Sequence, residues 1–158
     1  MKAIQGIAIR WEHDESADVS WLETTAESHY GENGSAWSHV DDEGLGRVVA
    51  KHGSILEACE HYAQQDAARL AAFHAGDWHL EGCYAVASVT VDGTRQTIRT
   101  PGLWGIESDS GEEYRREVEE EERAALLGIL SALGFDTTEE TTRLLDSLLA
   151  QVTQEEAA

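Results

Sequence analysis

An Asp-Gly pair at positions 92–93 follows a stretch, residues 78–91, in which apolar side chains recur with the period of two that is typical of a β-strand. The residues that mark this period are Tyr84, Val86, Val89 and Val91. Asp-Gly is a preferred pair for two-residue hairpin loops, because both loop positions adopt a positive φ. The sequence therefore predicts a β-hairpin that runs from residues 78–91 into residues 94–100.

A further strand and three helices are predicted around this hairpin. Residues 3–11 alternate in the same way at Ile7, Ile9 and Trp11. The helices are indicated by Ser/Thr-x-x-Glu patterns, in which the hydroxyl accepts a backbone N–H and the Glu reaches back to the cap. These patterns are Ser54–Glu57, Ser110–Glu113 and Thr137–Glu140. The first helix is expected to end at Gly76 and the second at Gly134, and the third is expected over residues 138–152.

Each predicted helix has an apolar face. For the first helix this face consists of Ile55, Cys59, Tyr62, Leu70 and Phe73, with Ala63 and Ala67 allowing close approach to a sheet. For the second it consists of Tyr114, Val118, Ala125, Ile129, Leu130 and Leu133, and for the third of Leu144, Leu145, Leu148, Leu149 and Val152. The predicted fold class is α+β, in which about three helices cover a small antiparallel sheet made of the N-terminal strand and the hairpin.

The 158 residues suit a single domain, expected over residues 1–158. Residues 12–47 lack periodicity and are rich in Ser, Gly, Asp and Glu, which predicts an irregular acidic excursion. Large apolar side chains are expected to anchor this excursion to the domain, namely Trp21, Leu22, Tyr30 and Trp37. The C-terminus is expected to fray after about residue 152.

The formal net charge of −20 limits the possible partners. Acidic residues concentrate in residues 1–44 and 106–158, whereas residues 45–105 are nearly neutral and are expected to build the core. Such a charge disfavours direct binding of nucleic acid and of anionic membranes. The sequence also lacks a signal-peptide pattern and an apolar run of about 20 residues, so a cytoplasmic protein is predicted.

Candidate metal and nucleophile positions are few. The two cysteines, Cys59 and Cys83, match neither a disulfide framework nor a zinc spacing, and they are expected to be buried where the first helix packs on the hairpin. The seven histidines form no pair at metal spacing on a helix face, although Glu57 and His61 lie one turn apart. No glycine-rich phosphate-binding loop is present, and neither a catalytic residue nor a cofactor is predicted.

The acidic helix that begins near Ser110 carries the sharpest candidate site. Its carboxylates, together with two that precede it, are expected to form a row that imitates nucleic-acid phosphates toward a basic groove. The residues of this predicted partner-binding site are Glu107, Asp109, Glu112, Glu113, Glu117 and Glu120, and Trp104 is expected either to brace the preceding loop or to anchor the partner. The competing interpretation is that Glu-to-Arg pairs at i,i+4, Glu112 with Arg116 and Glu119 with Arg123, make this helix an ordinary solvated surface.

The run Pro101-Gly102-Leu103-Trp104-Gly105-Ile106-Glu107-Ser108-Asp109-Ser110 resembles a family of small acidic proteins of bacterial phages, prophages and plasmids. The similarity extends to Gln96-Thr97-Ile98, Asp18-Val19-Ser20-Trp21-Leu22, Gly76-Asp77-Trp78 and the Leu133-Gly134-Phe135 end of the acidic helix, so it covers most of the chain. Pro101 departs from the pattern, in which a small residue, usually Gly, is expected. The resemblance implies a mobile-element protein and transfers no active site.

Three functional hypotheses follow from these patterns. The leading one is a non-enzymatic acidic inhibitor of a mobile element, whose partner is a basic nucleic-acid-binding protein of the host. The second is a divalent-metal site at Glu107 and Asp109, with hydrolytic chemistry, since paired carboxylates suit Mg²⁺ and Ca²⁺. The third is a protein from a salt-loaded cytoplasm, in which the acidity reflects the host and not a partner.

Overall fold

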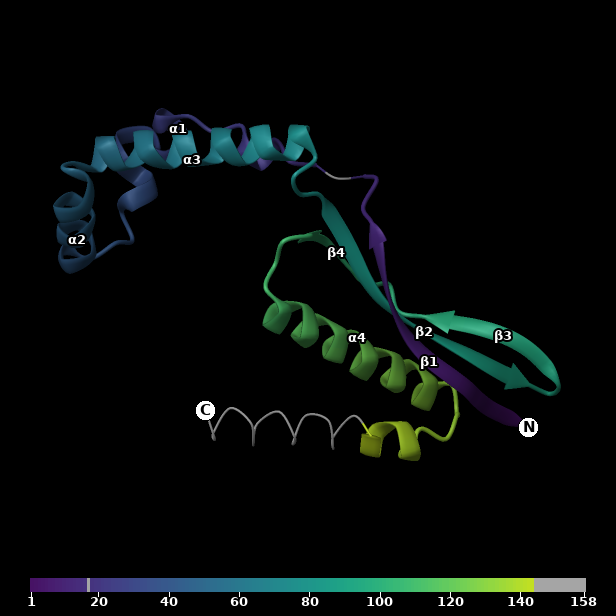
Figure 1. Cartoon of the computed structure of the whole chain (residues 1–158). Coiled ribbons are helices and arrows are strands. Elements are labelled where there is room, and N and C mark those ends of the chain that lie inside the picture. The colour runs from purple at the N-terminus through teal and green to yellow at the C-terminus, as the bar shows by residue number, and fades with distance from the viewer. Residues whose placement is uncertain (17, 144–158) are drawn as a thin grey trace. The chain divides into compact units, whose positions relative to one another are not determined.

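The computed structural model describes residues 1–16 and 18–143. By their contacts, the residues form two compact units: residues 1–15 with the chain from His79 onward, and residues 16–78 (Figure 1). The single domain expected over residues 1–158 stays a prediction, and the two units are described separately here. No described helix is both long enough and apolar enough to cross a membrane.

The first unit contains a four-stranded antiparallel sheet. Its strands are β1 (Lys2–His13), β2 (Leu80–Val91), β3 (Thr94–Arg99) and β4 (Leu103–Glu107). The long strand β2 pairs with β1 on one side, while β3 and β4 pair with the two ends of β2 on the other side. The predicted α+β class, the N-terminal strand and the hairpin are confirmed. Asp92 and Gly93 have φ values of 48° and 83°, as the two-residue loop requires.

Strand β4 was absent from the sequence prediction because it is short and contains Gly105. It follows Pro101 and Gly102, which signal a loop rather than a strand. The register with β2 shifts between Glu81 and Cys83, so β4 is an irregular partner. Tertiary pairing with the long strand β2 therefore decides the conformation of this segment.

Helix α4 (Glu112–Ala132) packs on one face of the sheet, as Figure 1 shows. Its buried side chains are Val118, Leu126, Leu127 and Leu130, and they meet the residues of β2 that point to that face, namely Cys83, Ala85, Ala87 and Val89. Small alanines in the strand let the helix approach closely. The predicted apolar face was wrong in part, because Tyr114, Ala125 and Leu133 are exposed.

The predicted start of this helix was also wrong. Gly111, not Ser110, is the N-cap, and it makes no side-chain capping bond. The two glutamates in the first turn, Glu112 and Glu113, stabilise the helix start through the dipole instead. The predicted end is confirmed, since the helix closes before Gly134, whose φ is 78°. Residues 138–143 are helical as expected, and the rest of the predicted third helix, with the fraying end, lies outside the described residues.

The second unit, residues 16–78, is helical. It contains the 3-10 helices η1 (Ser20–Leu22) and η2 (Glu32–Trp37), and the α-helices α1 (Ala26–Tyr30), α2 (Asp42–His52) and α3 (Ile55–Ala75). The segment expected to be irregular, residues 12–47, therefore includes several short helices. Helix α2 escaped prediction because its glycines and charges hide the apolar period, although Asp41 caps it by accepting the N–H of Gly44 at 2.7 Å.

Helix α3 begins as predicted, since the Ser54 hydroxyl accepts the N–H of Glu57 at 3.1 Å. Its neighbours differ from the prediction, which placed it on the sheet among about three covering helices. In the structure α3 packs on η1, α1 and α2, and α4 is the described helix that covers the sheet. Cys59 and Cys83 are both buried, as expected, but they belong to different compact units.

The helical unit is inserted between two paired strands. The chain leaves the sheet at the end of β1 and returns at the start of β2, where His13 is opposite Glu81. The N–H of Asp14 donates to the carbonyl of Leu80 at 2.8 Å, which extends the ladder by one bond. The two points at which the chain leaves and re-enters the sheet are therefore neighbours.

Candidate functional site

The outer side of α4 carries a row of exposed carboxylates. Its members are Glu113, Glu117 and Glu121, which are all exposed and for which no ion pair or hydrogen bond exists within residues 1–16 and 18–143. They follow at intervals of four residues, so that they recur about every 6 Å along the helix axis. Glu112 is exposed too, but it lies in the first turn on the other side of the helix, half a turn away from Glu121. We call Glu113, Glu117 and Glu121 the outer acidic row.

The other glutamates of α4 have different surroundings. Glu119 accepts a hydrogen bond from the indole N–H of Trp11 at 2.7 Å, and Glu122 accepts one from the hydroxyl of Thr100. The same Thr100 oxygen accepts the N–H of Ala85 at 3.0 Å, deep under the helix. These two carboxylates therefore fasten α4 to the sheet. The predicted i,i+4 pairing of Glu119 with Arg123 is replaced by the contact with Trp11.

Three of the predicted site residues are less available than the outer acidic row. Glu107, Asp109 and Glu120 each already have an interaction partner, and Glu107 and Glu120 are half-buried. Glu107 and Asp109 flank the turn before α4, in which the N–H of Ser110 donates to the Glu107 carbonyl at 3.0 Å. Within the described part of the chain, no three His, Cys, Asp or Glu side chains are grouped to hold a metal ion.

Trp104 lies on the face of the sheet that α4 does not cover. Gly82 and Tyr84 alternate along β2 with Cys83 and Ala85, which face the helix, so Gly82 and Tyr84 point the other way. The Trp104 indole lies over Gly82, where an added Cβ would come within 2.1 Å of the ring. It stacks on Tyr84 with centroids 6.5 Å apart, and its N–H donates to the Pro101 carbonyl at 3.0 Å. The structure thus separates Trp104 from the predicted acidic row.

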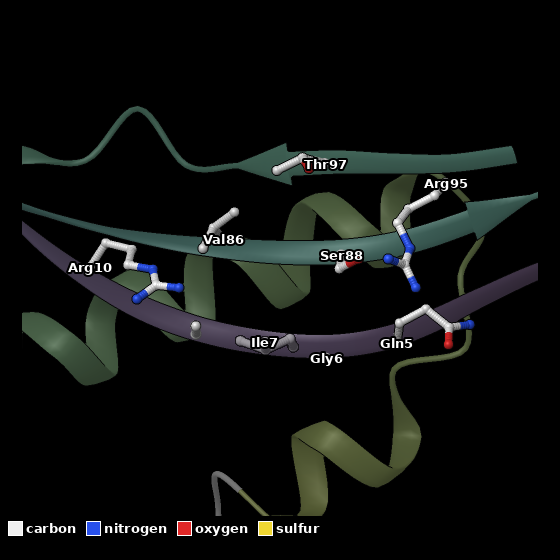
Figure 2. Close-up of a pocket in the computed structure, with 9 residues that line it drawn as sticks. Gln5, Gly6, Ile7, Arg10, Val86, Ser88, Arg95 and Thr97 are labelled. Carbon is white, nitrogen blue, oxygen red and sulfur yellow. The ribbon is translucent and has the colours of Figure 1, made fainter.

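A shallow groove of about 430 Å³ runs along this open face, as Figure 2 shows. Gly6, Ala8, Val86 and Ser88 form its floor, and Arg10 and Arg95 stand at its two ends. These arginines are exposed. Composition gave no signal for this groove, since Arg10 is far in the sequence from Arg95 and from Arg99, the third arginine of the open face, and strand register brings them together.

The end of the groove near Trp104 is packed by Tyr84. The Tyr84 hydroxyl donates to the carboxylate of Glu12, and the guanidinium of Arg99 lies 5.2 Å from the Tyr84 ring centroid. The bond to Glu12, followed by burial, raises the pKa of the Tyr84 phenol, so the phenol stays neutral. Glu12 keeps its negative charge in this contact, so the open face presents arginine, indole and the Glu12 carboxylate to solvent.

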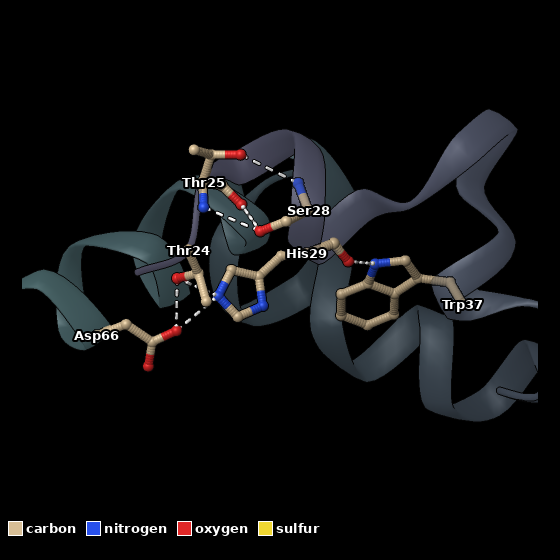
Figure 3. A network of polar contacts seen from close by, with 6 residues as sticks. All are labelled: Thr24, Thr25, Ser28, His29, Trp37 and Asp66. Carbon is tan, nitrogen blue, oxygen red and sulfur yellow. Dashed lines mark hydrogen bonds and ion pairs between the residues drawn. The ribbon is translucent and has the colours of Figure 1, made fainter. Parts of the chain in front are cut away.

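The helical unit has a polar network at the contact of α1 with α3 (Figure 3). The Thr24 hydroxyl donates to Asp66 at 2.6 Å, and Nε2 of His29 lies 2.8 Å from the same carboxylate oxygen. The hydroxyl bond is the main cause of the lowered Asp66 pKa, with His29 adding to it against burial. A catalytic triad needs both ring nitrogens of the histidine. Here one nitrogen meets both partners, so the network is structural.

A second aromatic group surrounds Tyr62 in this unit. Trp37 stacks on Tyr62 at 6.4 Å, and His52 meets it edge-on at 5.6 Å. The rings of His52 and His61 are 5.0 Å apart. Burial, with smaller contributions from Lys51 and His61, lowers the pKa of His52, which favours the neutral ring. This packing anchors Trp37, and Leu22 is buried as expected, whereas Trp21 and Tyr30, which were also expected as anchors, are exposed.

The cysteines offer no nucleophile. Both Cys59 and Cys83 have no exposed surface. Burial, and then the nearby charges of Glu119 and Glu122, raise the pKa of the Cys83 thiol to about 11, so the thiolate is disfavoured at neutral pH. Cys83 therefore acts as a small apolar side chain under α4.

Comparison with known proteins gives no identity. No protein-family model, no curated protein and no solved structure matches this chain. Function is therefore argued from the two surfaces of the sheet unit, the outer acidic row of α4 and the arginine-lined open face.

Proposed function

We propose that this protein is a non-enzymatic acidic inhibitor, which occupies the basic groove of a nucleic-acid-binding protein by imitating phosphates. The observation that supports this proposal is the outer acidic row, in which three exposed carboxylates lie along one side of a helix without described partners. An ordinary solvated helix would offset such charges with i,i+4 ion pairs. The row is instead left available to cations from outside.

The outer acidic row carries charge at about half the axial density of one nucleic-acid strand. From Glu113 to Glu121 the helix advances about 12 Å, with one carboxylate about every 6 Å. A strand of duplex DNA carries one phosphate per about 3.4 Å of axis. The row therefore offers regularly spaced negative charges on one face, and the rigid helix presents them without further ordering. Helix-borne carboxylates therefore provide a suitable counterpart for lysines and arginines spaced to grip phosphates.

The resemblance to phage, prophage and plasmid proteins supplies a setting for such an inhibitor. Mobile elements gain when host defence or repression proteins that hold nucleic acid are blocked. The proposal concentrates on α4 and on Glu107 and Asp109 before it, and it omits Trp104, which lies on the other face of the sheet. The expected partner is a basic nucleic-acid-binding protein.

The test is retention of host proteins from a nuclease-treated bacterial lysate on the immobilised chain, across a salt series. A basic nucleic-acid-binding protein should be retained stoichiometrically and released as salt rises, because screening weakens contacts between exposed charges. Added chain should then displace DNA or RNA from the purified partner. A partner that binds the chain and its nucleic acid simultaneously would contradict mimicry.

Variants localise the effect. Glu113→Gln, Glu117→Gln and Glu121→Gln combined should weaken partner binding at least about tenfold, since each removed charge loses a charge-assisted contact. The matched control carries Glu23→Gln, Glu32→Gln and Glu60→Gln, which are exposed in the helical unit and change the net charge equally. Equal binding by both triple variants would show that net charge alone acts and would overturn the assignment to α4.

A further inference from the structure

The open face of the sheet concentrates positive charge in a protein whose net charge is −20. Arg10 projects from β1, and Arg95 and Arg99 project from β3, all toward the side away from α4. Within the described residues, Arg10 and Arg95 make no hydrogen bond or ion pair, and Arg99 contacts the ring of Tyr84. The carboxylate of Glu12 lies on the same face and offsets one of these three charges, and the remaining excess of guanidinium groups suits an anionic ligand.

The arginines form a row, which follows from strand register. Arg10 lies opposite Tyr84 of β2. Arg99 lies opposite Val86, and Arg95 lies opposite Thr90. Six residues of antiparallel strand span about 20 Å. The groove between Arg10 and Arg95 has a floor of small side chains, so a chain-like ligand fits against the backbone (Figure 2). An extended polyanion matches this row better than a single small anion does.

The indole ring of Trp104 forms a flat apolar surface at the end of the row near Arg10. The indole of Trp104 is fixed from below by Gly82, from the side by Tyr84 and at its N–H by the Pro101 carbonyl. It remains 41% exposed. A ring held flat on a sheet and open to solvent is suited to stacking of a nucleobase, which contributes about 1–3 kcal/mol per base in single-strand-binding proteins.

We propose that this open face binds a short single strand of nucleic acid, with its phosphates on Arg10, Arg99 and Arg95 and one base on Trp104. The expectation that the chain binds no nucleic acid treats its charge as uniform. In the structure the outer acidic row is on the side of α4 turned away from the sheet, and the helix that separates the row from the sheet is itself about 10 Å across. At physiological salt this distance exceeds the screening length of about 8 Å.

An acidic peptide is the competing occupant, and the geometry favours it less. Extended peptides gain affinity by adding to the edge of a sheet, where backbone N–H and C=O groups are free. The groove instead lies on the face of β1 and β2, whose backbone groups are paired with each other. Base stacking and phosphate contacts need no backbone partner, so single-stranded nucleic acid fits this face.

The experiment is fluorescence anisotropy of the full chain with a labelled dodecamer of thymidine and one of uridine, in 150 mM salt. Saturable binding is expected for a single strand, and a duplex of equal length should bind at least about tenfold more weakly, because its bases cannot stack on an indole. Intrinsic fluorescence should fall on binding, and Trp104→Phe should remove most of this quenching.

Charge variants complete the test. Arg10→Gln with Arg95→Gln should weaken binding at least about tenfold and reduce the slope of log affinity against log salt by about 1.4, that is about 0.7 per lost phosphate contact. Arg47→Gln with Arg116→Gln changes the net charge equally at α2 and α4 and should leave affinity within about twofold. All four arginines lie at helix or strand surfaces, so thermal melting checks that the fold is retained.

Three results would overturn the proposal. One is the absence of saturable binding to either dodecamer at 150 mM salt. Another is equal weakening by the two double variants, which would assign binding to net charge and not to the open face. The third is tighter binding of a labelled polyglutamate peptide than of the dodecamers, because the open face would then be an acceptor for acidic protein. This surface lies opposite the outer acidic row, so the result is independent of the inhibitor proposal.

Discussion

Gly82 has a role that depends on the absence of a side chain. The Trp104 indole fills the space above it, and an added Cβ would lie 2.1 Å from ring carbon Cε3 and 2.5 Å from Cζ3. The ring cannot shift freely, because Tyr84 stacks beside it and the Pro101 carbonyl holds its N–H. A single glycine in the middle of a strand therefore determines where the exposed indole sits. Glycine in a strand commonly marks such close approach.

Gly82→Ala should destabilise the fold by about 1–3 kcal/mol, as overpacking does when the neighbour cannot move. The measurement is urea unfolding followed by circular dichroism. Gly128→Ala is the matched control: Gly128 lies in α4 with nothing within 4 Å of its added Cβ, so this change should stabilise by about 0.5–1 kcal/mol. A Gly82→Ala variant as stable as the wild type, or more stable, would show that Trp104 does not pack on Gly82 in solution.

The acidic residues of helix α4 are close together in the sequence but have different roles. Glu119 and Glu122 point toward the sheet and accept hydrogen bonds from Trp11 and Thr100, whereas the outer acidic row points to solvent. The sequence displays one continuous acidic segment, and helical periodicity alone predicts that its members divide between faces. It does not predict that two carboxylates find buried donors, because those donors come from β1 and from the segment before β4.

Glu119→Ala should lower the free energy of unfolding by about 1.5–3 kcal/mol, the range for a hydrogen bond to a charged group, since the Trp11 indole N–H then loses its acceptor. Glu117→Ala, two residues away on the outer side, should change stability by less than about 0.5 kcal/mol. Chemical denaturation of both variants gives the comparison. Equal effects would mean that the contact between α4 and β1 is absent in solution.

The elements that local signals specify were predicted, and those that depend on distant partners were not. Asp92-Gly93 fixes its hairpin through its own backbone preferences, and Ser54 caps α3 through a bond three residues away. Strand β4 forms by pairing with β2, which is distant in sequence. The apolar face of α4 was predicted wrongly in part, because Tyr114 and Leu133 fit the helical period but are exposed. The outer acidic row was predicted in part, with Glu121 omitted. The open arginine face was missed, since strand register creates it.

Salt distinguishes a functional acidic surface from an adaptation to a salt-loaded host. Five carboxylates accept hydrogen bonds from side chains of other elements, namely Glu12, Asp66, Glu81, Glu119 and Glu122. The other acidic side chains affect stability mainly through long-range repulsion. We expect the protein to remain folded at 20 mM salt and its melting temperature to rise by only a few degrees up to 1 M. Thermal melts by circular dichroism measure this. Loss of structure at 20 mM salt would favour the halophile interpretation.

The insertion of residues 16–78 between β1 and β2 has a consequence for the order of folding. Were that segment unfolded, joining the two strands would close a loop of about 65 residues, which costs roughly 2.5 kcal/mol more than a four-residue turn. Helices α1, α2 and α3 form contacts close in sequence, which assemble early. Once they have assembled, the ends of the segment are already neighbours, as the bond between Asp14 and Leu80 requires. The assembled helical unit thereby takes the place of a short turn between β1 and β2, and we expect its assembly to speed the pairing of these two strands.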